Sequence, residues 1–232
     1  MKPRVTIGIP SFNSEQWLEQ AIASALAQTW PEKEVIVVDD GSTDRSREIA
    51  HGFDGRILFF SASHRGANHA RNEILRNASG EWIQYLDSDD CLLPEKITRQ
   101  FEEAGSRDDC DVIYGPVLID ENSKREVSAM DPNLDLYARW ISWQLPQTGG
   151  CLWRRTALDG VGGWNEQMPC CQEHELYLRA LKAGLRFRFT PTANAVYRIW
   201  SDTTLCRRDP RQVVTIRTGL IDDMKEWMEK SG

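Results

Sequence analysis

Short apolar runs alternate with helical patterns over the first hundred residues, and this alternation restricts the possible folds more than any other feature of the chain. Apolar runs of about four to eight residues predict buried strands, whereas apolar residues at i, i+4 spacing predict helices that bury one face. A strand–helix–strand series predicts an α/β fold with a mostly parallel sheet and helices on both faces. The predicted strands are residues 5–9, 34–38, 57–61 and 81–86, and the predicted helices are residues 15–28, 43–51 and 66–77.

The pattern is looser in the second half of the chain. No linker rich in Pro, Gly and Ser divides it, so one domain over residues 1–210 is expected. Residues 211–232 carry apolar side chains at helical spacing and predict an amphipathic helix docked on that domain, with a helix on a membrane surface as the alternative. The other predicted helices are residues 94–104, 133–141 and 173–183, and the other predicted strands are residues 112–114, 150–154, 186–189 and 196–200.

The composition is that of an ordinary globular protein, with 41% hydrophobic and 27% charged residues. The formal charge of −7 argues against nucleic acid as a partner. The N-terminal residues lead directly into a predicted strand, and no apolar run approaches the roughly 18 residues that a membrane span needs. A cytoplasmic protein with reduced cysteines is therefore expected.

Acidic residues follow two of the predicted strands. The sequence Asp-Ser-Asp-Asp at residues 87–90 comes directly after one strand, and Asp39 and Asp40 end another. Like charges packed this closely repel one another, and a divalent cation that bridges to a phosphate would relieve the repulsion. Because ligands of parallel sheets bind at the carboxyl ends of the strands, the two clusters predict a nucleotide-diphosphate site at that edge.

Four segments occur in a fixed order along the first half of the chain. They are Ile-Pro-Ser-Phe-Asn at 9–13, Val-Val-Asp-Asp-Gly-Ser-Thr-Asp at 37–44, Gly66 with Ala-Arg-Asn at 70–72, and Leu-Asp-Ser-Asp-Asp at 86–90. Together they resemble the nucleotide-sugar half of a family 2 glycosyltransferase. The resemblance implies a GT-A fold in which residues 1–100 bind the nucleotide sugar and residues 101–210 bind the acceptor. It also implies an inverting, metal-dependent transfer from a nucleotide-diphosphate sugar, with UDP as the expected nucleotide.

The resemblance assigns the nucleobase to two loops. Pro10, Phe12 and Asn13 match the family loop that lies against the base, although Phe12 could equally belong to the core. Asp39 matches an aspartate that accepts a hydrogen bond from a base N–H such as that of uracil, and a turn-forming role is the alternative. Asp40 fits a ligand contact and a turn-stabilising role about equally well.

The resemblance assigns the diphosphate and the metal to the acidic loop. Asp87 and Asp89 match the family Asp-x-Asp motif, whose oxygen ligands suit Mn²⁺ or Mg²⁺. Asp89 would bind the metal directly, Asp87 would bind ribose hydroxyls or metal-bound waters, and Ser88 would contribute to the donor site. Arg71 is similar to the family arginine near the nucleotide and this loop, with a surface salt bridge as the alternative.

The catalytic base is predicted at the start of the helix over residues 173–183. An acceptor hydroxyl must lose a proton as it attacks the sugar, which requires a carboxylate on the acceptor side. The family uses an Asp in a Glu-Asp pair; Glu173 aligns with that Asp, and Gln172 replaces the preceding acid. Glu173 is therefore the predicted base, with His174 or Glu175 as the fallback and a favourable charge at the helix N-terminus as the alternative.

The acceptor side is less specific in sequence. Aromatic faces suit sugar rings, and Trp164 is predicted to contact the acceptor because it is the tryptophan nearest to Glu173 in sequence. Residues 198–208 contain three arginines, which fits either a loop that closes over the diphosphate or a solvated loop. By resemblance, the acceptor is a carbohydrate or a lipid-linked sugar, with peripheral contact at the inner face of a membrane.

Two other functions compete with glycosyl transfer. A GT-A-like binding protein without catalysis would explain the altered pair at residues 172–173, but the intact Asp87 and Asp89 argue against it. A sugar nucleotidyltransferase would need a basic, Gly-rich phosphate loop after the first strand, which residues 9–13 lack. The predicted function is an inverting glycosyltransferase of polysaccharide or glycoconjugate synthesis, and its sugar, acceptor and oligomeric state are left open.

Overall fold

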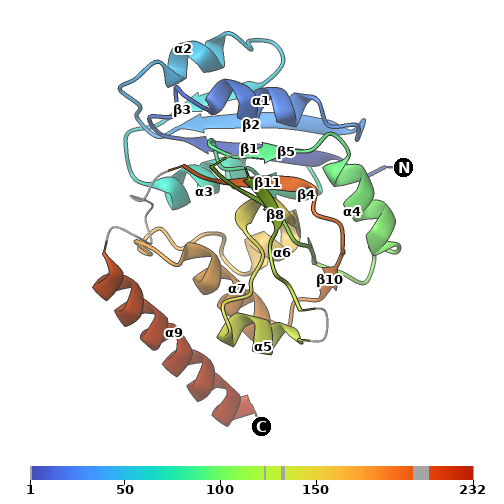
Figure 1. Cartoon of the computed structure of the whole chain (residues 1–232), viewed down its shortest axis with the longest axis vertical. Helices are drawn as coiled ribbons and strands as arrows, with labels where there is room; N and C mark the ends of the chain where they lie inside the picture. The colour runs from blue at the N-terminus through green and yellow to red at the C-terminus, as the bar shows by residue number, and fades with distance from the viewer. Residues whose placement is uncertain (1, 123, 132–133, 201–208, 232) are drawn as a thin grey trace.

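A mostly parallel sheet forms the centre of the computed structural model, which describes residues 2–122, 124–131, 134–200 and 209–231 (Figure 1). Its strands are β1 (Val5–Ser11), β2 (Lys33–Asp39), β3 (Leu58–Ser61), β4 (Trp82–Tyr85), β6 (Val112–Tyr114), β9 (Cys151–Arg154) and β10 (Phe187–Phe189). Within the described residues the order is β10-β6-β9-β4-β1-β2-β3, and only β9 is antiparallel to its neighbours. The predicted α/β fold with a mostly parallel sheet is confirmed.

Helices cover both faces of this sheet (Figure 1). They are α1 (Leu18–Leu26), α2 (Ser46–His51), α3 (Ala67–Asn77), α4 (Lys96–Ala104), α5 (Leu136–Ile141), the 3-10 turn η1 (Thr148–Gly150), α6 (Arg155–Gly160), α7 (Gln172–Lys182) and α9 (Pro210–Ser231). Side chains of α1 and α4 belong to one hydrophobic core, and those of α3, α6 and α7 belong to another. Every helix predicted from the sequence is present, and α6 was not predicted.

Successive side chains along each strand point to opposite faces of the sheet, so one sheet contributes side chains to both cores. In β2, Val35 and Val37 join the core of α1 and α4, whereas Ile36 and Val38 join the core of α3 and α7. Helix α3 packs so closely on β1 that a Cβ atom added to Gly8 would lie 2.3 Å from Cγ2 of Ile74. Strands β1 and β4 are buried along their whole length, so a ligand can reach them at their ends, where the acidic residues lie.

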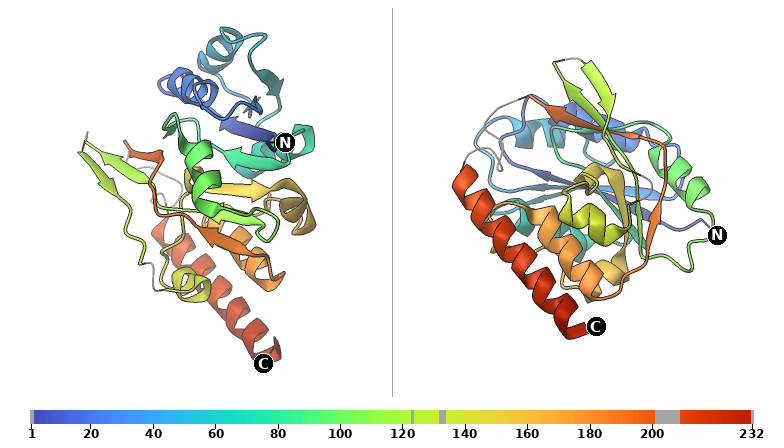
Figure 2. Two further views of the ribbon diagram at one scale, coloured as in Figure 1. Left: turned by 90° about the vertical axis from the view of Figure 1, so that its right-hand side faces the viewer. Right: turned by 60° about the horizontal axis from the view of Figure 1, so that its bottom comes forward.

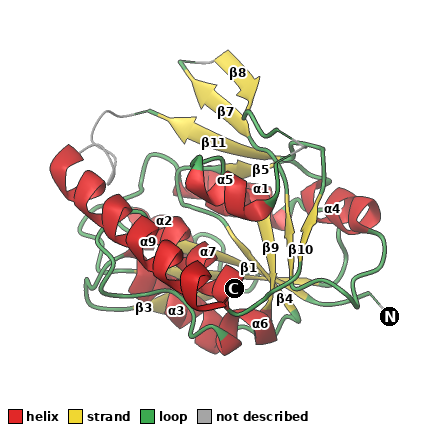
Figure 3. Cartoon of the chain, turned by 90° about the horizontal axis from the view of Figure 1, so that it is seen from below, coloured by secondary structure: helices red, strands yellow, loops and turns green. Residues whose placement is uncertain are grey.

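A second, smaller sheet lies beside the main one (Figure 3). Its strands are β5 (Cys91–Leu92), β7 (Leu118–Glu121), β8 (Lys124–Val127) and β11 (Ala195–Ile199), in the order β5-β11-β7-β8. The sequence predicted only β11, because β5 has two residues and β7 and β8 contain no fully buried side chain. Strand β5 directly follows residues 87–90, and β11 pairs with it. The second sheet therefore places β11, which comes late in the sequence, beside the acidic loop.

Helix α9 packs against α7 at one side of the molecule (Figure 2). Val213, Leu220 and Met224 of α9 are buried. Lys182 of α7 forms an ion pair with Asp223 of α9 at 2.6 Å. The apolar face of the amphipathic helix predicted from the sequence is thus the face that α9 packs against the rest of the chain. Among the described residues, no helix is both long enough and apolar enough to cross a membrane.

A lysine is buried in the core that contains α1 and α4. Lys96 is 1% exposed, and its ammonium donates a hydrogen bond to Oε1 of Gln84, a buried residue of β4. Burial lowers the pKa of Lys96 to about 7, because the charged ammonium loses its hydration there. The folded chain therefore releases a proton from Lys96 at a pH where the unfolded chain still holds it.

The free energy of unfolding is expected to rise with pH between the folded pKa of about 7 and the ordinary value of 10.5 for Lys96. Below that window both states bind the proton, so the free energy of unfolding no longer changes with pH through this group. Lys96→Met should increase stability at neutral pH and reduce the slope within the window by up to about 1.4 kcal/mol per pH unit. Urea unfolding of both proteins across the window measures the two slopes, and equal slopes would contradict the prediction.

Candidate active site

The carboxyl ends of β1, β2 and β4 meet at one edge of the sheet, because these strands are parallel neighbours. The loop after β1 touches the ends of both other strands. Oγ of Ser14 lies 2.6 Å from Oγ of Ser88 in the acidic loop. The N–H of Asn13 donates to Oγ of Ser42, beyond β2, at 2.9 Å. The two acidic clusters predicted from the sequence therefore flank a single loop.

That loop exposes an aromatic ring. Phe12 is 43% exposed and stacks on His64, with ring centroids 4.0 Å apart, so it is not a core residue. Asn13 has a φ of 48°, which asparagine tolerates, and its Oδ1 accepts a hydrogen bond from the N–H of Thr43 at 2.9 Å. Pro10 lies inside β1 and is buried. Sequence reasoning assigned no role to His64.

Asp39 and Asp40 are both buried at the end of β2 but have different partners. Arg47 donates a hydrogen bond from Nε to Oδ2 of Asp39 at 2.6 Å, and the N–H of Ser42 lies 3.3 Å from each of its oxygens. The carboxylate oxygens of Asp40 accept hydrogen bonds from the N–H groups of residues 65–66 at 2.9 and 2.8 Å. Asp40 thus holds the turn into α3, and Asp39 combines a turn contact with an ion pair.

The acidic loop after β4 packs three carboxyl groups close together. Burial raises the pKa of Asp89, and the charge of Asp87 raises it further. Burial also raises the pKa of Asp90 well above its ordinary value, with added repulsion from Asp89 and Asp87. Oδ1 of Asp90 accepts a hydrogen bond from the N–H of Arg198 at 2.8 Å. The loop is therefore held by β11 and retains repulsion between like charges, which a cation would relieve.

Arg71 of α3 connects this loop with the start of α7. Its Nη2 donates to Oδ1 of Asp87 at 2.7 Å, and its Nη1 donates to Oε1 of Gln172 at 2.8 Å and to Oδ1 of Asn68 at 3.1 Å. Burial lowers the pKa of Arg71, but the charges of Asp87 and Glu173 outweigh it and raise the pKa overall. At 4% exposed, Arg71 is not part of a surface salt bridge.

Glu173 lies in the first turn of α7, next to the residue that Arg71 contacts. Oε1 of Glu173 accepts a hydrogen bond from Oγ1 of Thr148 at 2.7 Å, and Thr148 begins η1. Within the described part of the chain, Oε2 of Glu173 accepts no hydrogen bond, which leaves that oxygen available to take a proton. The structure therefore brings the predicted base into the same cluster as Arg71 and Asp87.

The two fallback candidates for the base are engaged elsewhere. Glu175 is buried, and its two oxygens accept hydrogen bonds from Nε and Nη2 of Arg179, each at 2.7 Å. Burial, with the nearby charge of Arg217, lowers the pKa of His174 to about 3. An imidazole with so low a pKa is a weak base near neutral pH. Glu173 is the best-placed candidate of the three.

Trp164 lies in the core instead of facing an acceptor. Its side chain is 3% exposed. The ring centroid lies 4.5 Å from the guanidinium carbon of Arg71 and 5.4 Å from the ring of Tyr85, which meets it edge-on. A ring enclosed in this way offers no face to a sugar, so this structure does not support the predicted acceptor contact. The position of Trp164 instead suits support of the Arg71 guanidinium.

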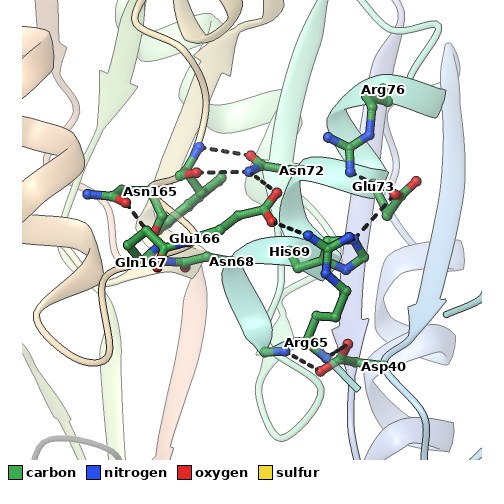
Figure 4. Close-up of polar contacts among 12 residues, drawn as sticks. Asp40, Arg65, Asn68, His69, Asn72, Glu73, Arg76, Asn165, Glu166 and Gln167 are labelled. Atoms are coloured by element: carbon green, nitrogen blue, oxygen red, sulfur yellow. Dashed lines mark hydrogen bonds and ion pairs between the residues drawn. The ribbon is translucent and has the colours of Figure 1, made fainter. Parts of the chain in front are cut away.

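Polar side chains of the α3 region fasten the segment that precedes α7, and sequence reasoning missed them (Figure 4). The side-chain amide of Asn72 donates to the carbonyl of Trp164 and accepts from its N–H, both at 2.8 Å. Asn68 donates to the carbonyl of the next residue at 2.7 Å, and Arg65 pairs with Glu166 at 3.1 Å. Their i, i+3 and i+7 spacing along one helical face was the signal that could have found them.

The carboxylates of the acidic loop can hold a cation only if a substrate supplies further ligands to it. In the part of the chain that the structure describes, no group of three or more His, Cys, Asp and Glu side chains is arranged to hold a metal ion alone. Mg²⁺ is commonly bound by one or two carboxylates together with substrate phosphates. Asp89, with its pKa raised beside Asp87, fits that pattern.

Solved glycosyltransferase structures share this GT-A fold. S. aureus TarS in complex with UDP-GlcNAc superposes with a TM-score of 0.71 at 21% identity, over 87% of this chain and 60% of the TarS chain. The mannosyltransferase PcManGT from Pyrobaculum calidifontis, in complex with GDP-Man and Mn²⁺, gives a TM-score of 0.65 at 21% identity, over 85% of this chain and 57% of its own.

Curated glycosyltransferases are also similar in sequence. The uncharacterized glycosyltransferase RC0461 of Rickettsia conorii is 34% identical over 192 residues, which is 78% of this chain and 32% of that protein. The uncharacterized glycosyltransferase alr2836 of Nostoc sp. is 32% identical over 170 residues, which is 68% of this chain and 53% of its own. The chain thus spans about a third to a half of these relatives. The model of glycosyl transferase family 2 matches residues 6–162, so the chain belongs to that family.

Proposed function

We propose that the chain transfers a sugar, with inversion, from a nucleotide-diphosphate sugar to an acceptor hydroxyl. The observation that carries this proposal is the Arg71 bridge. One guanidinium contacts both Asp87 of the acidic loop and Gln172, the neighbour of Glu173. A donor-side carboxylate and an acceptor-side carboxylate are thereby held in one cluster, which a transferase needs and a simple nucleotide-binding module does not.

The donor site is proposed at the ends of β1, β2 and β4. The exposed ring of Phe12, stacked on His64, suits a nucleobase, and Asp39 is the proposed acceptor for a base N–H. Asn13 and Ser88 border the same edge, whereas Pro10 shapes it from within β1. The complexes of TarS with UDP-GlcNAc and of PcManGT with GDP-Man support a nucleotide sugar as the donor. We propose a UDP-sugar.

The reaction proposed for this site is a single displacement. The acceptor oxygen forms a bond to the anomeric carbon while the bond from that carbon to the diphosphate oxygen breaks. Glu173 takes the proton of the acceptor hydroxyl, and its hydrogen bond to Thr148 fixes the carboxylate for this task. Asp89, with Asp87 nearby, would hold Mn²⁺ or Mg²⁺, which when bound supplies positive charge beside the departing diphosphate. Arg71 keeps Asp87 oriented throughout.

The proposed acceptor is a carbohydrate or a lipid-linked sugar, used in polysaccharide or glycoconjugate synthesis at the inner face of a membrane. Exposed apolar side chains of α9 recur at seven-residue spacing and support a peripheral membrane contact. Co-sedimentation with vesicles of anionic phospholipid tests this contact, and equal sedimentation of wild type and Ile221→Glu would speak against it. The recurring side chains are Val214, Ile221 and Met228.

Calorimetry with UDP, in the presence and absence of Mn²⁺, tests the donor site on wild type and Asp89→Ala. Binding that needs both the cation and Asp89 is the expected result. Hydrolysis of UDP-sugars in the same buffer then distinguishes an enzyme from a binding protein that has lost catalysis. Failure to bind UDP or any other nucleoside diphosphate under all conditions would overturn the proposal.

A further inference from the structure

The side chain that follows β11 contacts the proposed metal ligand. The indole Nε1–H of Trp200 donates a hydrogen bond to Oδ2 of Asp89 at 2.9 Å, although 55% of Trp200 is exposed. Because Trp200 is largely exposed, burial contributes little to holding its side chain in place. The hydrogen bond to the carboxylate is the interaction that explains where the side chain lies. The two residues are 111 positions apart in the chain, and the contact exists only because β11 pairs beside the acidic loop.

The backbone that carries Trp200 is anchored without the help of its indole. The N–H of Arg198 donates to Asp90 at 2.8 Å, and Nη1 of Arg198 donates to the carbonyl of Asp89 at 2.7 Å. The guanidinium of Arg198 also lies 4.7 Å from the ring centroid of Trp17. The end of β11 is therefore fixed by Arg198, and the Trp200 ring can leave Asp89 by rotating its side chain.

The indole N–H occupies an oxygen of the carboxylate that the proposed function assigns to a divalent cation. Both partners place positive charge at the oxygen atoms of Asp89, close to the negative charges of Asp87 and Asp90. A hydrogen bond to a charged group is stronger than one between neutral groups, so the contact stabilises the cation-free loop. A cation that takes the lone pair of Oδ2 that the indole N–H now shares would displace this hydrogen bond.

We propose that Trp200 is a displaceable cap on Asp89, which satisfies this carboxylate before the donor binds and weakens the affinity of the site for the cation until the indole moves away. Trp200 is on this view a positioning residue of the donor site, and the proposal rests on the metal role that the proposed function gives to Asp89. Trp200→Phe keeps an aromatic ring but removes the N–H, so it should release the competition without emptying the space.

Mn²⁺ binding, measured from the free-ion signal in electron paramagnetic resonance with UDP present, tests the cap on the full chain. Trp200→Phe is expected to bind Mn²⁺ about three- to tenfold more tightly than wild type, in keeping with the modest net strength of a hydrogen bond whose donor side chain is largely exposed to water. Trp17→Phe is the matched control, because Trp17 lies beside Trp200 at 6.3 Å between ring centroids and has no hydrogen bond to Asp89; its affinity should not change.

The outcomes separate the cap from the proposed function. If Asp89→Asn abolishes Mn²⁺ binding but Trp200→Phe binds Mn²⁺ no more tightly than wild type, the cap alone is overturned. Binding that survives Asp89→Asn would overturn the metal role of Asp89 and the cap with it. A second readout is the indole N–H resonance of Trp200, identified by its loss in Trp200→Phe. Addition of Mg²⁺ and UDP should shift it toward the position of a solvent-exposed indole, and an unshifted resonance in the bound protein would contradict the cap.

Discussion

Glu173→Gln is expected to lower the rate constant of glycosyl transfer by about a hundredfold to ten-thousandfold, which is the usual contribution of a general base. The amide has nearly the same shape as the carboxylate, so it can still accept the hydrogen bond from Thr148. It cannot take a proton from the acceptor hydroxyl. Donor binding should stay within about twofold, because binding of UDP does not use this proton transfer. Steady-state kinetics, together with calorimetry of UDP binding, measures both quantities.

Two further substitutions make the Glu173 result specific. Glu173→Asp restores the residue that the family motif carries and should retain part of the activity, although its carboxylate is one methylene shorter. His174→Gln should change the rate little, since the pKa of His174 is lowered to about 3 and its ring takes no part in proton transfer near neutral pH. Full activity of Glu173→Gln with a large loss in His174→Gln would show that the base had been assigned to the wrong residue.

Arg71→Ala is expected to reduce both stability and activity. It removes the partner of Asp87 and the contact to Gln172 from a buried site. Breaking a buried ion pair costs about 3 kcal/mol of unfolding free energy, and the partial exposure of Asp87 places the expected loss at or somewhat below that value. The specificity constant kcat/KM should fall at least about a hundredfold, because the acidic loop and the start of α7 lose the group that holds them together. Arg71→Lys should rescue little, since one ammonium cannot reproduce the fork of contacts.

Arg76→Ala is the matched control on the same helix. Arg76 pairs with Glu73 at 2.7 Å on the exposed side of α3, with 53% of its side chain accessible. Its removal should change the unfolding free energy by no more than about 0.5 kcal/mol and leave activity unchanged. Urea unfolding and kinetics on both variants make the comparison. Equal effects of the two substitutions would mean that the Arg71 bridge contributes nothing beyond an ordinary surface ion pair.

Much of the donor side of the site could be read from sequence. The strands that end at Asp39 and at residues 87–90 follow from short apolar runs, and parallel pairing then places their carboxyl ends at one edge. The structure places both ends on either side of the loop after β1, as that reasoning requires. The start of α7 was also predicted closely, so Glu173 was placed in the first turn of a helix before any tertiary contact was known.

The acceptor side was less predictable, for a physical reason. Trp164 was expected to contact a sugar because aromatic side chains do so, but the same ring packs equally well beneath a guanidinium, and sequence distance from Glu173 does not decide between the two. Only the approach of α3 encloses it against Arg71 and Tyr85. The second sheet was missed because its strands are short and lack a buried face, so no period of apolar residues marks them.

The amino-acid sequence by itself determined the order of strands and helices from β1 to β4 and the edge of the sheet at which the acidic clusters meet, since these depend on local side-chain periodicity and on the residues that follow each apolar run. Tertiary structure alone decided which groups act together. Arg71 and Gln172 are 101 positions apart, and Trp200 and Asp89 are 111 apart, yet both pairs are in hydrogen-bond contact. Such contacts depend on how segments that are distant in sequence pack around a common core. A local pattern of residues does not show which distant segments will lie close together in space.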